Sequence, residues 1–281
     1  MTLPLLLALP MVLLATGVYA VVTARQPDGS RMAYSVALAV STVALMAALA
    51  YLVSGQAPET LRLPIGLPKL GAHLPGAHFR LDALAAFFLI VVNLGSAVAS
   101  LFALGYGRHE KAPERVLPFY SAFLAGMNLV LLADDAFAFL FAWEFMSLSS
   151  WALVMAHHRD PANTRAGYLY LVMACFGTLA LLLTFGLLAG PDGGYDFETI
   201  RAGQITPGPA ALVLVLALIG AGSKAGLVPL HVWLPLAHPA APSHVSALMS
   251  GVMTKVAIYG FIRIIFDLLG EPVAWWWGGL V

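Results

Sequence analysis

Five ionisable residues lie within apolar runs of this chain, and their types fit the handling of protons: Glu144, Lys224, His231, His244 and Lys255. A charged side chain at the centre of a membrane helix costs about 2.5–3.5 kcal/mol on insertion scales. Such residues therefore usually face a protein interior or a water-filled path. A carboxylate at that depth must be protonated, paired or hydrated, and histidine titrates near neutral pH. Together these residues predict the movement of protons, or of another cation, within a membrane.

Lys224 has the most distinctive surroundings. It lies between Gly222 and Gly226, a pair of small residues that lets another helix approach closely. Pro229 follows and should break the helix, because proline lacks the backbone N–H that the helix needs. Glu144 offers a carboxylate at comparable depth. The two can form a switchable pair that handles protons, or a structural ion pair that locks two helices together.

His244 and Lys255 are eleven residues apart, which in a regular α-helix returns to almost the same face about 16 Å further along. They predict a stripe with two titratable stations, although His244 can equally cap the helix or contact water. His231 follows the expected break by two residues. It can act as a proton relay or be a satisfied histidine at a helix break.

The elements that position these residues are membrane helices. The chain has 281 residues, of which 60% are hydrophobic and 10% charged, whereas soluble domains carry about 25% charged residues. A net charge of zero gives no basic patch for nucleic acid. We expect an all-α integral membrane protein, a bundle of about eight spans with a broken seventh helix. The expected spans are roughly 3–22, 32–54, 81–106, 116–133, 135–157, 165–189, 210–230 and 244–268.

Loop charges predict the orientation. The loops after spans one, three and five carry seven Lys or Arg residues, against four in the loops after spans two, four and six. The first set is therefore predicted to be cytoplasmic and the N-terminus outside. The segment 55–80 is rich in Gly and Pro and is predicted to be an extracytoplasmic loop with a short hairpin. We divide the chain into residues 1–80, two helices and this loop, and residues 81–281, an antiporter-like domain.

Several single residues have structural interpretations. Asp82 is expected to stabilise the start of span three, and Asp134 and Asp135 that of span five. Arg263 is expected to extend from the end of span eight towards the interface. The single cysteine, Cys175, excludes an internal disulfide and any multi-cysteine metal or iron–sulfur site. Its apolar surroundings predict a small buried side chain. The three tryptophans at 275–277 predict an interfacial belt.

Two segments resemble a known family. FLFAWEFMSLSSWALV and SKAGLVPLHVWLPLAHPAAPSHVSALMSGVMTKVAIYGFIR are similar to the antiporter-like subunits of respiratory complex I and of multisubunit sodium/proton antiporters. The variant SHVSALMSGVMTKVAIYG is most similar to the B component of hydrogenase-4, a membrane subunit, and to the matching subunit of formate hydrogenlyase. The resemblance runs from about Asp82 onward.

The resemblance implies a fold of about fourteen spans with two inverted repeats, each containing a broken helix. It implies that Glu144 is the span-five glutamate, which pairs with Lys224 of the broken helix. Lys255 matches the span-eight lysine that passes the proton on, and His231 a histidine just beyond the break. The eight spans here correspond to the first repeat, so we expect one half-channel rather than a complete transmembrane path.

The leading hypothesis is a proton-translocating subunit of an energy-converting redox complex in the cytoplasmic (inner) membrane, hydrogenase-like or NADH–quinone-oxidoreductase-like. The chain has no redox or hydrolytic centre of its own, and we expect no cofactor or metal. Expected partners are other membrane subunits and peripheral iron–sulfur or hydrogenase-like subunits. One alternative is a subunit of a secondary sodium/proton antiporter. Another is a membrane anchor that transports nothing and holds peripheral enzyme subunits.

Overall fold

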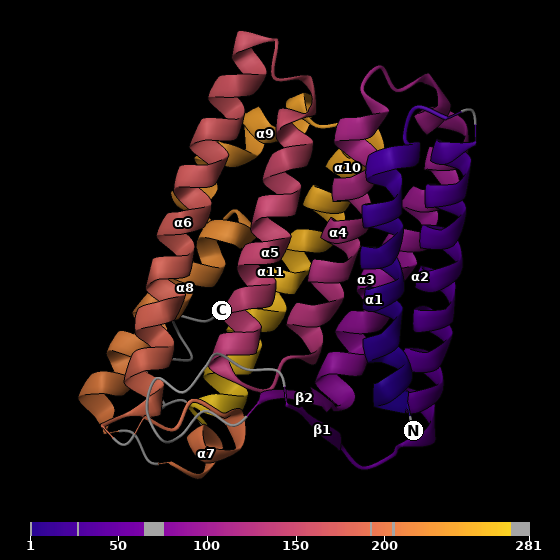
Figure 1. Ribbon diagram of the computed structural model, residues 1–281. Coiled ribbons are helices and arrows are strands. Elements are labelled where there is room, and N and C mark those ends of the chain that lie inside the picture. Colours follow the sequence, from indigo (N-terminus) through magenta and orange to yellow (C-terminus); the bar gives the residue numbers. More distant parts are fainter. Residues whose placement is uncertain (1, 27, 65–75, 192, 204–205, 271–281) are drawn as a thin grey trace.

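The computed structural model describes residues 2–26, 28–64, 76–191, 193–203 and 206–270. Within them the chain is a helical bundle with one small hairpin (Figure 1). The elements are α1 Thr2–Thr23, α2 Gly29–Ser54, β1 Glu59–Leu63, β2 Ala77–Leu81, α3 Ala83–Tyr106, α4 Pro113–Leu132, α5 Ala136–Val154, α6 Pro161–Ala189, α7 Phe197–Ala202, α8 Pro207–Ala225, α9 Leu234–Ala240, α10 Ser243–Leu248 and α11 Thr254–Ile262. Short 3₁₀ turns cover Gly107–His109, Met155–His157 and Leu230–Trp233, and π-helical turns cover Met249–Met253 and Arg263–Leu268.

The described residues contain eight helical stretches that are long and apolar enough to cross a membrane. This confirms the expected number and places of the spans. The seventh is longer than predicted, because α8, the 3₁₀ turn and α9 continue one another as far as Ala240. The break that Pro229 predicts is present, since α8 ends at Ala225.

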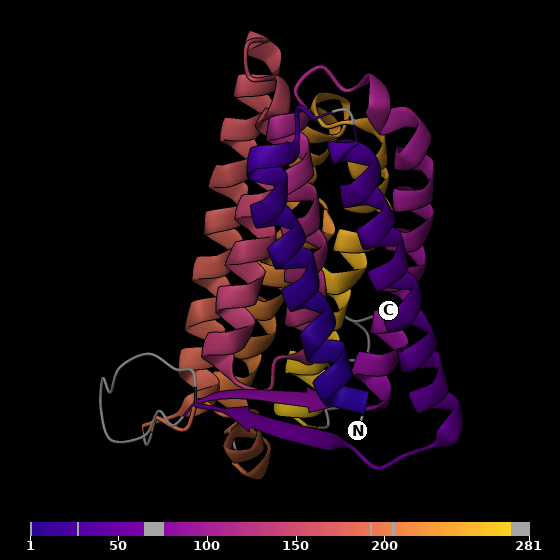
Figure 2. The ribbon, with the colours of Figure 1, turned by 45° about the vertical axis from the view of Figure 1, so that its right-hand side comes forward.

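The spans pack in a row, and the last span returns to the middle of that row. The helices α1 and α2 lie at one side of the bundle and α6 and α8 at the other, with α4, α5 and α11 between them (Figures 1 and 2). The last span runs back through the middle, where α11 contacts α3, α4 and α8. It therefore reaches residues of the first spans as well as those of the broken helix.

Aspartates begin several helices. The Asp82 carboxylate accepts a hydrogen bond from the backbone N–H of Ala85 at 2.9 Å, and Asp135 accepts one from Ala138 at 2.7 Å. Both satisfy N–H groups that have no partner inside their own helix. The expected stabilising roles of these two residues are confirmed.

The hairpin predicted between spans two and three is also present. Strands β1 and β2 pair antiparallel, with Glu59 opposite Leu81, and they lie across the end of the bundle that holds the N-terminus (Figure 2). The backbone N–H of Asp134 donates to His78 of β2 at 2.8 Å, which fixes the hairpin to the start of α5. The expected tryptophan belt at 275–277 lies outside the described residues.

The prediction that Arg263 extends to the interface is wrong. Its side chain is only 4% exposed and donates to Asp82 at 2.7 and 2.8 Å and to Asp267 at 2.9 Å. It belongs to a buried network of three arginines and three aspartates, Arg80, Asp82, Asp134, Arg201, Arg263 and Asp267. The acidic partners come from distant parts of the chain, so no local pattern around Arg263 indicates them. The prediction for Cys175 is also wrong, because its side chain is exposed on α6.

Charge pairing in this network is strong enough to hold Asp82 ionised. Burial alone would raise the pKa of Asp82, but the hydrogen bonds and charge of Arg263 outweigh burial and lower that pKa to about 2. Asp82 therefore contributes stability above the ordinary pKa of an aspartate, and this contribution is lost as the pH falls through about 2.

We expect Arg263→Met to lower the free energy of unfolding by about 3 kcal/mol, because Asp82 and Asp267 lose their shared buried cation and keep only Arg80 and Arg201 as partners. Thermal unfolding of the detergent-solubilised protein measures the effect. Arg25→Met is the matched control, since the ion pair of Arg25 with Glu114 has a cation that is 80% exposed and such pairs contribute little. Equal melting temperatures for the two variants would contradict a stabilising role for the network.

Candidate proton-transfer site

Lys224 lies in the last turn of α8, where the seventh span is broken. Gly226 follows α8 with a φ of +79°, a left-handed conformation that glycine adopts without strain. Its N–H and that of Leu227 both donate to the carbonyl of Gly222. The indole N–H of Trp233 donates to the carbonyl of Ser223 at 2.7 Å. Lys224 thus lies in the last turn of a half-helix, where the negative end of the helix dipole stabilises a cation.

The Lys224 side chain is held by a tyrosine rather than by a carboxylate. Lys224 is 3% exposed, and its Nζ donates to the Tyr170 hydroxyl at 3.0 Å and lies 4.9 Å from the centre of that ring. The Tyr170 hydroxyl also contacts Ser150 Oγ at 2.6 Å. Residues from α5, α6 and α8 therefore meet around one buried amine.

Two glycines bring α6 and α8 close enough for this contact. A Cβ on Gly177 would lie 3.0 Å from the carbonyl oxygen of Gly220, and a Cβ on Gly220 would lie 2.9 Å from that of Gly177. Tyr170 is two turns before Gly177 on the same face of α6, and Lys224 is one turn after Gly220 on the same face of α8. The close crossing therefore sets the distance between the amine and the hydroxyl.

We expect Gly177→Val to reduce proton flux about a hundredfold, because it forces the helices apart and moves Lys224 away from Tyr170 by an ångström or more. Gly186→Val is the matched control, since a Cβ on Gly186 of the same helix would meet no atom within 4 Å. Proton flux in membrane vesicles is measured together with the amount of folded protein. Equal flux in the two variants would contradict the importance of the crossing.

Glu144 lies on α5 in a different environment. Its side chain is half-buried, and its Oε1 accepts a hydrogen bond from Thr178 of α6. Phe141 and Leu148 lie one turn away on the same face of α5 and are 75% and 48% exposed. The carboxylate therefore faces the groove between α5 and α6 near the outer surface of the bundle.

The structure does not join Glu144 to Lys224. The ion pairs of the described residues do not include these two. Their partners on α6, Thr178 and Tyr170, are eight residues apart, or about 12 Å along a helix. The pairing that the resemblance implies requires another arrangement of these side chains.

His231 and His244 occupy different parts of the last two spans. His231 is half-buried in the 3₁₀ turn after the break, and its Nδ1 is buried without a hydrogen-bond partner. His244 begins α10 and is 1% exposed. Its Nε2 lies 3.1 Å from the Tyr34 hydroxyl, and its Nδ1 has no partner. Each histidine thus has one buried ring nitrogen with no hydrogen-bond partner among the described residues.

Lys255 is exposed on the outside of the bundle, whereas His244 is buried. Lys255 Nζ donates to the carbonyl of Ser250 at 3.4 Å and to Thr254 Oγ1 at 3.3 Å. The expectation that His244 and Lys255 share a face is wrong. The π-helical turn Met249–Met253 lies between them, and its wider i→i+5 turns rotate every residue beyond it relative to a regular α-helix.

Sequence reasoning missed the hydroxyl groups that serve these residues. Tyr170 binds the amine, Ser150 contacts the Tyr170 hydroxyl, Thr178 binds Glu144, and Tyr34 contacts His244. Tyrosine, serine and threonine are ordinary in membrane spans, so their types carried no signal. Only their contacts with the charged residues identify them.

The sequence of this chain is similar to those of known membrane proteins. Residues 133–281 match the family described as NADH:quinone oxidoreductase/Mrp antiporter, transmembrane. The chain is 44% identical over 205 residues to hydrogenase-4 component B of Escherichia coli (strain K12), covering 72% of this chain and 30% of that protein. It is 33% identical over 272 residues to a putative antiporter subunit of Staphylococcus haemolyticus, covering 94% of this chain and 52% of the relative.

A solved structure has the same fold. A chain of the Mrp complex from Dietzia sp. DQ12-45-1b superposes with a TM-score of 0.73 at 27% identity, covering 94% of this chain and 49% of that one. The chain thus spans between about a third and a half of the length of these proteins.

Proposed function

Since the chain belongs to the NADH:quinone oxidoreductase/Mrp antiporter transmembrane family, we propose that it moves protons as a membrane subunit of an energy-converting redox complex. It is an antiporter-like integral membrane subunit of the hydrogenase, NADH–quinone oxidoreductase or Mrp type. In the proposal, Glu144, Lys224 and Lys255 carry the proton, with His231 and His244 as relays.

The buried amine of Lys224 is the observation that carries the proposal. It is 3% exposed, and its hydrogen-bond partner is the neutral hydroxyl of Tyr170. A buried lysine with a purely structural role would be paired with a carboxylate, because an uncompensated buried charge is destabilising. An amine held by a hydroxyl can instead exist with or without its proton. This arrangement supports proton handling over the anchor alternative.

Energy enters the proposed cycle through the distance between Glu144 and Lys224. When the two side chains approach, the carboxylate favours the protonated amine, and when they separate, as here, the amine releases its proton more readily. A partner subunit that moves Glu144 would therefore drive release from Lys224. Glu144 is half-buried beside exposed Phe141 and Leu148, so a neighbouring subunit can reach it.

The exposed position of Lys255 supports a contact with further transmembrane protein. Its side chain is exposed in the middle of the last span. A lysine facing hydrocarbon is costly, so such residues face protein or a water-filled cavity. We propose that further transmembrane protein covers this face and takes the proton from Lys255. By the loop charges, the N-terminal end of α1 lies outside the cytoplasm.

A second function has its own support. The similarity to the antiporter subunit of S. haemolyticus covers nearly the whole chain, so sodium/proton exchange without redox subunits is the competing proposal. Both functions use the same buried lysine. They differ in the source of energy for proton movement, which is electron transfer in the first proposal and a sodium gradient in the second.

Affinity purification of the natively encoded protein in mild detergent, with mass spectrometry of its bound partners, separates the two. Iron–sulfur or hydrogenase-like subunits would support the redox-driven form, and antiporter subunits alone would support sodium/proton exchange. Inverted membrane vesicles then show whether proton movement follows the electron donor of those subunits or a sodium gradient. Proton movement under neither drive would contradict transport and leave the anchor.

A further inference from the structure

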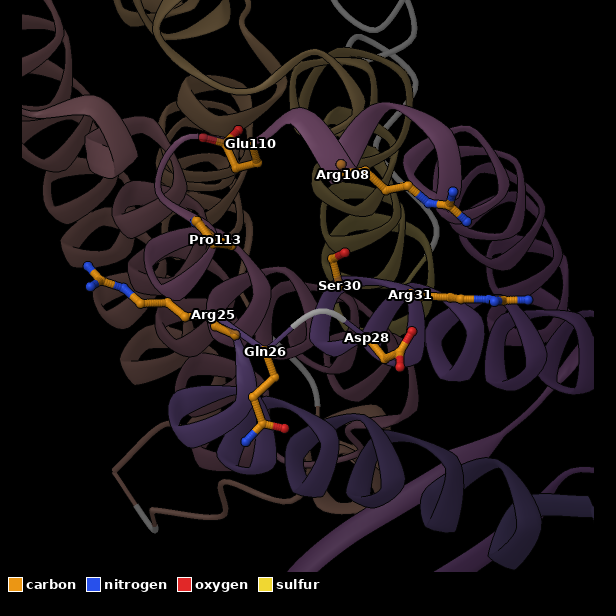
Figure 3. Close-up of a pocket in the computed structure, with 10 residues that line it drawn as sticks. Arg25, Gln26, Asp28, Ser30, Arg31, Arg108, Glu110 and Pro113 are labelled. Carbon is orange, nitrogen blue, oxygen red and sulfur yellow. The ribbon is translucent and has the colours of Figure 1, made fainter.

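A pocket of about 410 Å³ opens between the turns that follow α1 and α3. This is the end of the bundle that the loop charges predict to be cytoplasmic. Figure 3 shows Ser30 and Glu110 at the edge of the hollow, while the guanidinium groups of Arg25, Arg31 and Arg108 extend away from it. With its cations turned outwards, the pocket is shaped for water rather than for an anion. Its volume accommodates on the order of ten water molecules.

Tyr34 lies directly behind the wall of this pocket. Ser30, which lines the pocket, is one helical turn before Tyr34 on the same face of α2. Gly107 also lines it, and a Cβ on Gly107 would overlap the Tyr34 ring and lie 3.1 Å from the tyrosine hydroxyl. Because Gly107 has no side chain, the Tyr34 ring can pack directly against the backbone of this pocket-lining residue.

The Tyr34 hydroxyl lies between the pocket wall and His244. It lies 3.1 Å from His244 Nε2, and the two side chains are 0% and 1% exposed. His244 Nδ1 is buried without a partner. His244 therefore has one ring nitrogen on the pocket side and another available for onward transfer along the span that carries Lys255.

Glu110 is a buried carboxylate in a pocket that exposed Asp28 and three exposed arginines also line. It lines the pocket, its side chain is 6% exposed, and its Oε1 lies 2.8 Å from His157 Nε2. A buried carboxylate at the mouth of a path attracts protons from solution.

We infer that this pocket is the site where protons pass between the solution and His244, with the Tyr34 hydroxyl as the relay. Opening of the short 3₁₀ turn Gly107–His109 lets pocket water reach the hydroxyl. A hydronium ion then gives a proton to the Tyr34 oxygen while the hydroxyl gives its own proton to His244 Nε2. One O–H bond of hydronium and the original O–H bond of Tyr34 break, while a new O–H bond on Tyr34 and an N–H bond on His244 Nε2 form. The resulting imidazolium carries a proton on Nδ1 that it can pass on. This inference rests on the proposed function.

Tyr34→Phe tests the relay, because it removes the hydroxyl and keeps the ring. We expect proton flux in native-membrane vesicles to fall at least tenfold under the drive that supports the wild-type protein. Tyr120→Phe is the matched control, because the Tyr120 ring also packs against His244, while its hydroxyl contacts Ser100 at 2.8 Å. We expect its flux to stay within twofold of the wild type.

The outcomes separate this inference from the proposed function. Wild-type flux in Tyr34→Phe, with flux abolished in Lys224→Met, would overturn the relay and leave proton transport intact. Wild-type flux in both variants would overturn the role of Lys224 in the proposed function as well as the relay. Equal losses in Tyr34→Phe and Tyr120→Phe would show that packing around His244 matters rather than the hydroxyl, and would also overturn the relay.

A labelling experiment tests the pocket without relying on the tyrosine. Ser30→Cys is made in a Cys175→Ala background, because Cys175 is an exposed free thiol. A charged, membrane-impermeant thiol reagent added from the pocket side should label the thiol introduced at position 30 and reduce proton flux at least fivefold. Lys111→Cys is the control, since Lys111 is an exposed loop residue that does not line the pocket, and its labelling should leave flux unchanged. Absent labelling at position 30, or full labelling with unchanged flux, would overturn the inference.

Discussion

Lys224→Met should abolish driven proton flux, reducing it to the level of vesicles without the protein. The variant removes the Lys224 amine, which gains and loses the proton in the proposed cycle. Methionine has a similar volume and is expected to fill the same space. The folded state should be at least as stable as the wild type, because a buried amine is replaced by an apolar side chain. Flux is followed by a pH-sensitive dye in inverted vesicles, with the amount of assembled complex measured in parallel.

Two further variants identify which property of Lys224 matters. Lys224→Arg keeps the positive charge, but a guanidinium group does not release its proton, so flux should also be lost. Lys111→Met is the control for charge, because Lys111 is an exposed loop residue, and its flux should equal the wild type. Full flux in Lys224→Arg would show that the site needs a fixed charge, and the proposed proton release would be wrong.

Glu144→Gln is expected to reduce driven proton flux about a hundredfold or more, the effect of removing a group that takes part directly in proton transfer. Glutamine keeps the size of the side chain and can still accept the hydrogen bond from Thr178. The variant therefore removes the charge and leaves the local contacts. Because Lys224 has its own partner in Tyr170, we expect assembly and thermal stability to change little.

Thr178→Val separates the charge of Glu144 from its position. This variant removes the hydroxyl that donates to Glu144 and keeps the carboxylate. We expect a smaller loss of flux than in Glu144→Gln, because the charge that biases Lys224 is still present. If instead Thr178→Val and Glu144→Gln lose flux equally, the position of the carboxylate matters more than its charge.

The buried arginine network and the proton-transfer residues follow different physical rules. Arg263 is paired with carboxylates that compensate its charge, so its removal should lower the melting temperature. Lys224 has a neutral hydroxyl as its partner, so its removal should stop transport and preserve the fold. Comparing melting temperature with flux for the two variants therefore distinguishes a structural charge from a functional one.

The covalent sequence determined the spans, the helix starts and the break in the seventh helix. Each depends on local chemistry: a run of about 20 apolar residues crosses the hydrocarbon core. The Asp82 and Asp135 side chains cap the helices that follow them. Gly226 and Pro229 end and interrupt α8. The family could also be identified from local segments, because the residues around Glu144 and Lys224 occur in the same order as in the antiporter-like subunits that they resemble.

Tertiary structure alone decided which groups meet. Lys224 contacts Tyr170 because Gly177 and Gly220 let α6 and α8 cross closely, and no local pattern specifies that crossing. Arg263 finds Asp82, 181 residues away, and not the interface. Lys255 turns outwards because a π-helical turn shifts the register after His244. Long-range packing and one wider helical turn, neither encoded by spacing along the chain, therefore set the partners of every charged residue in the site.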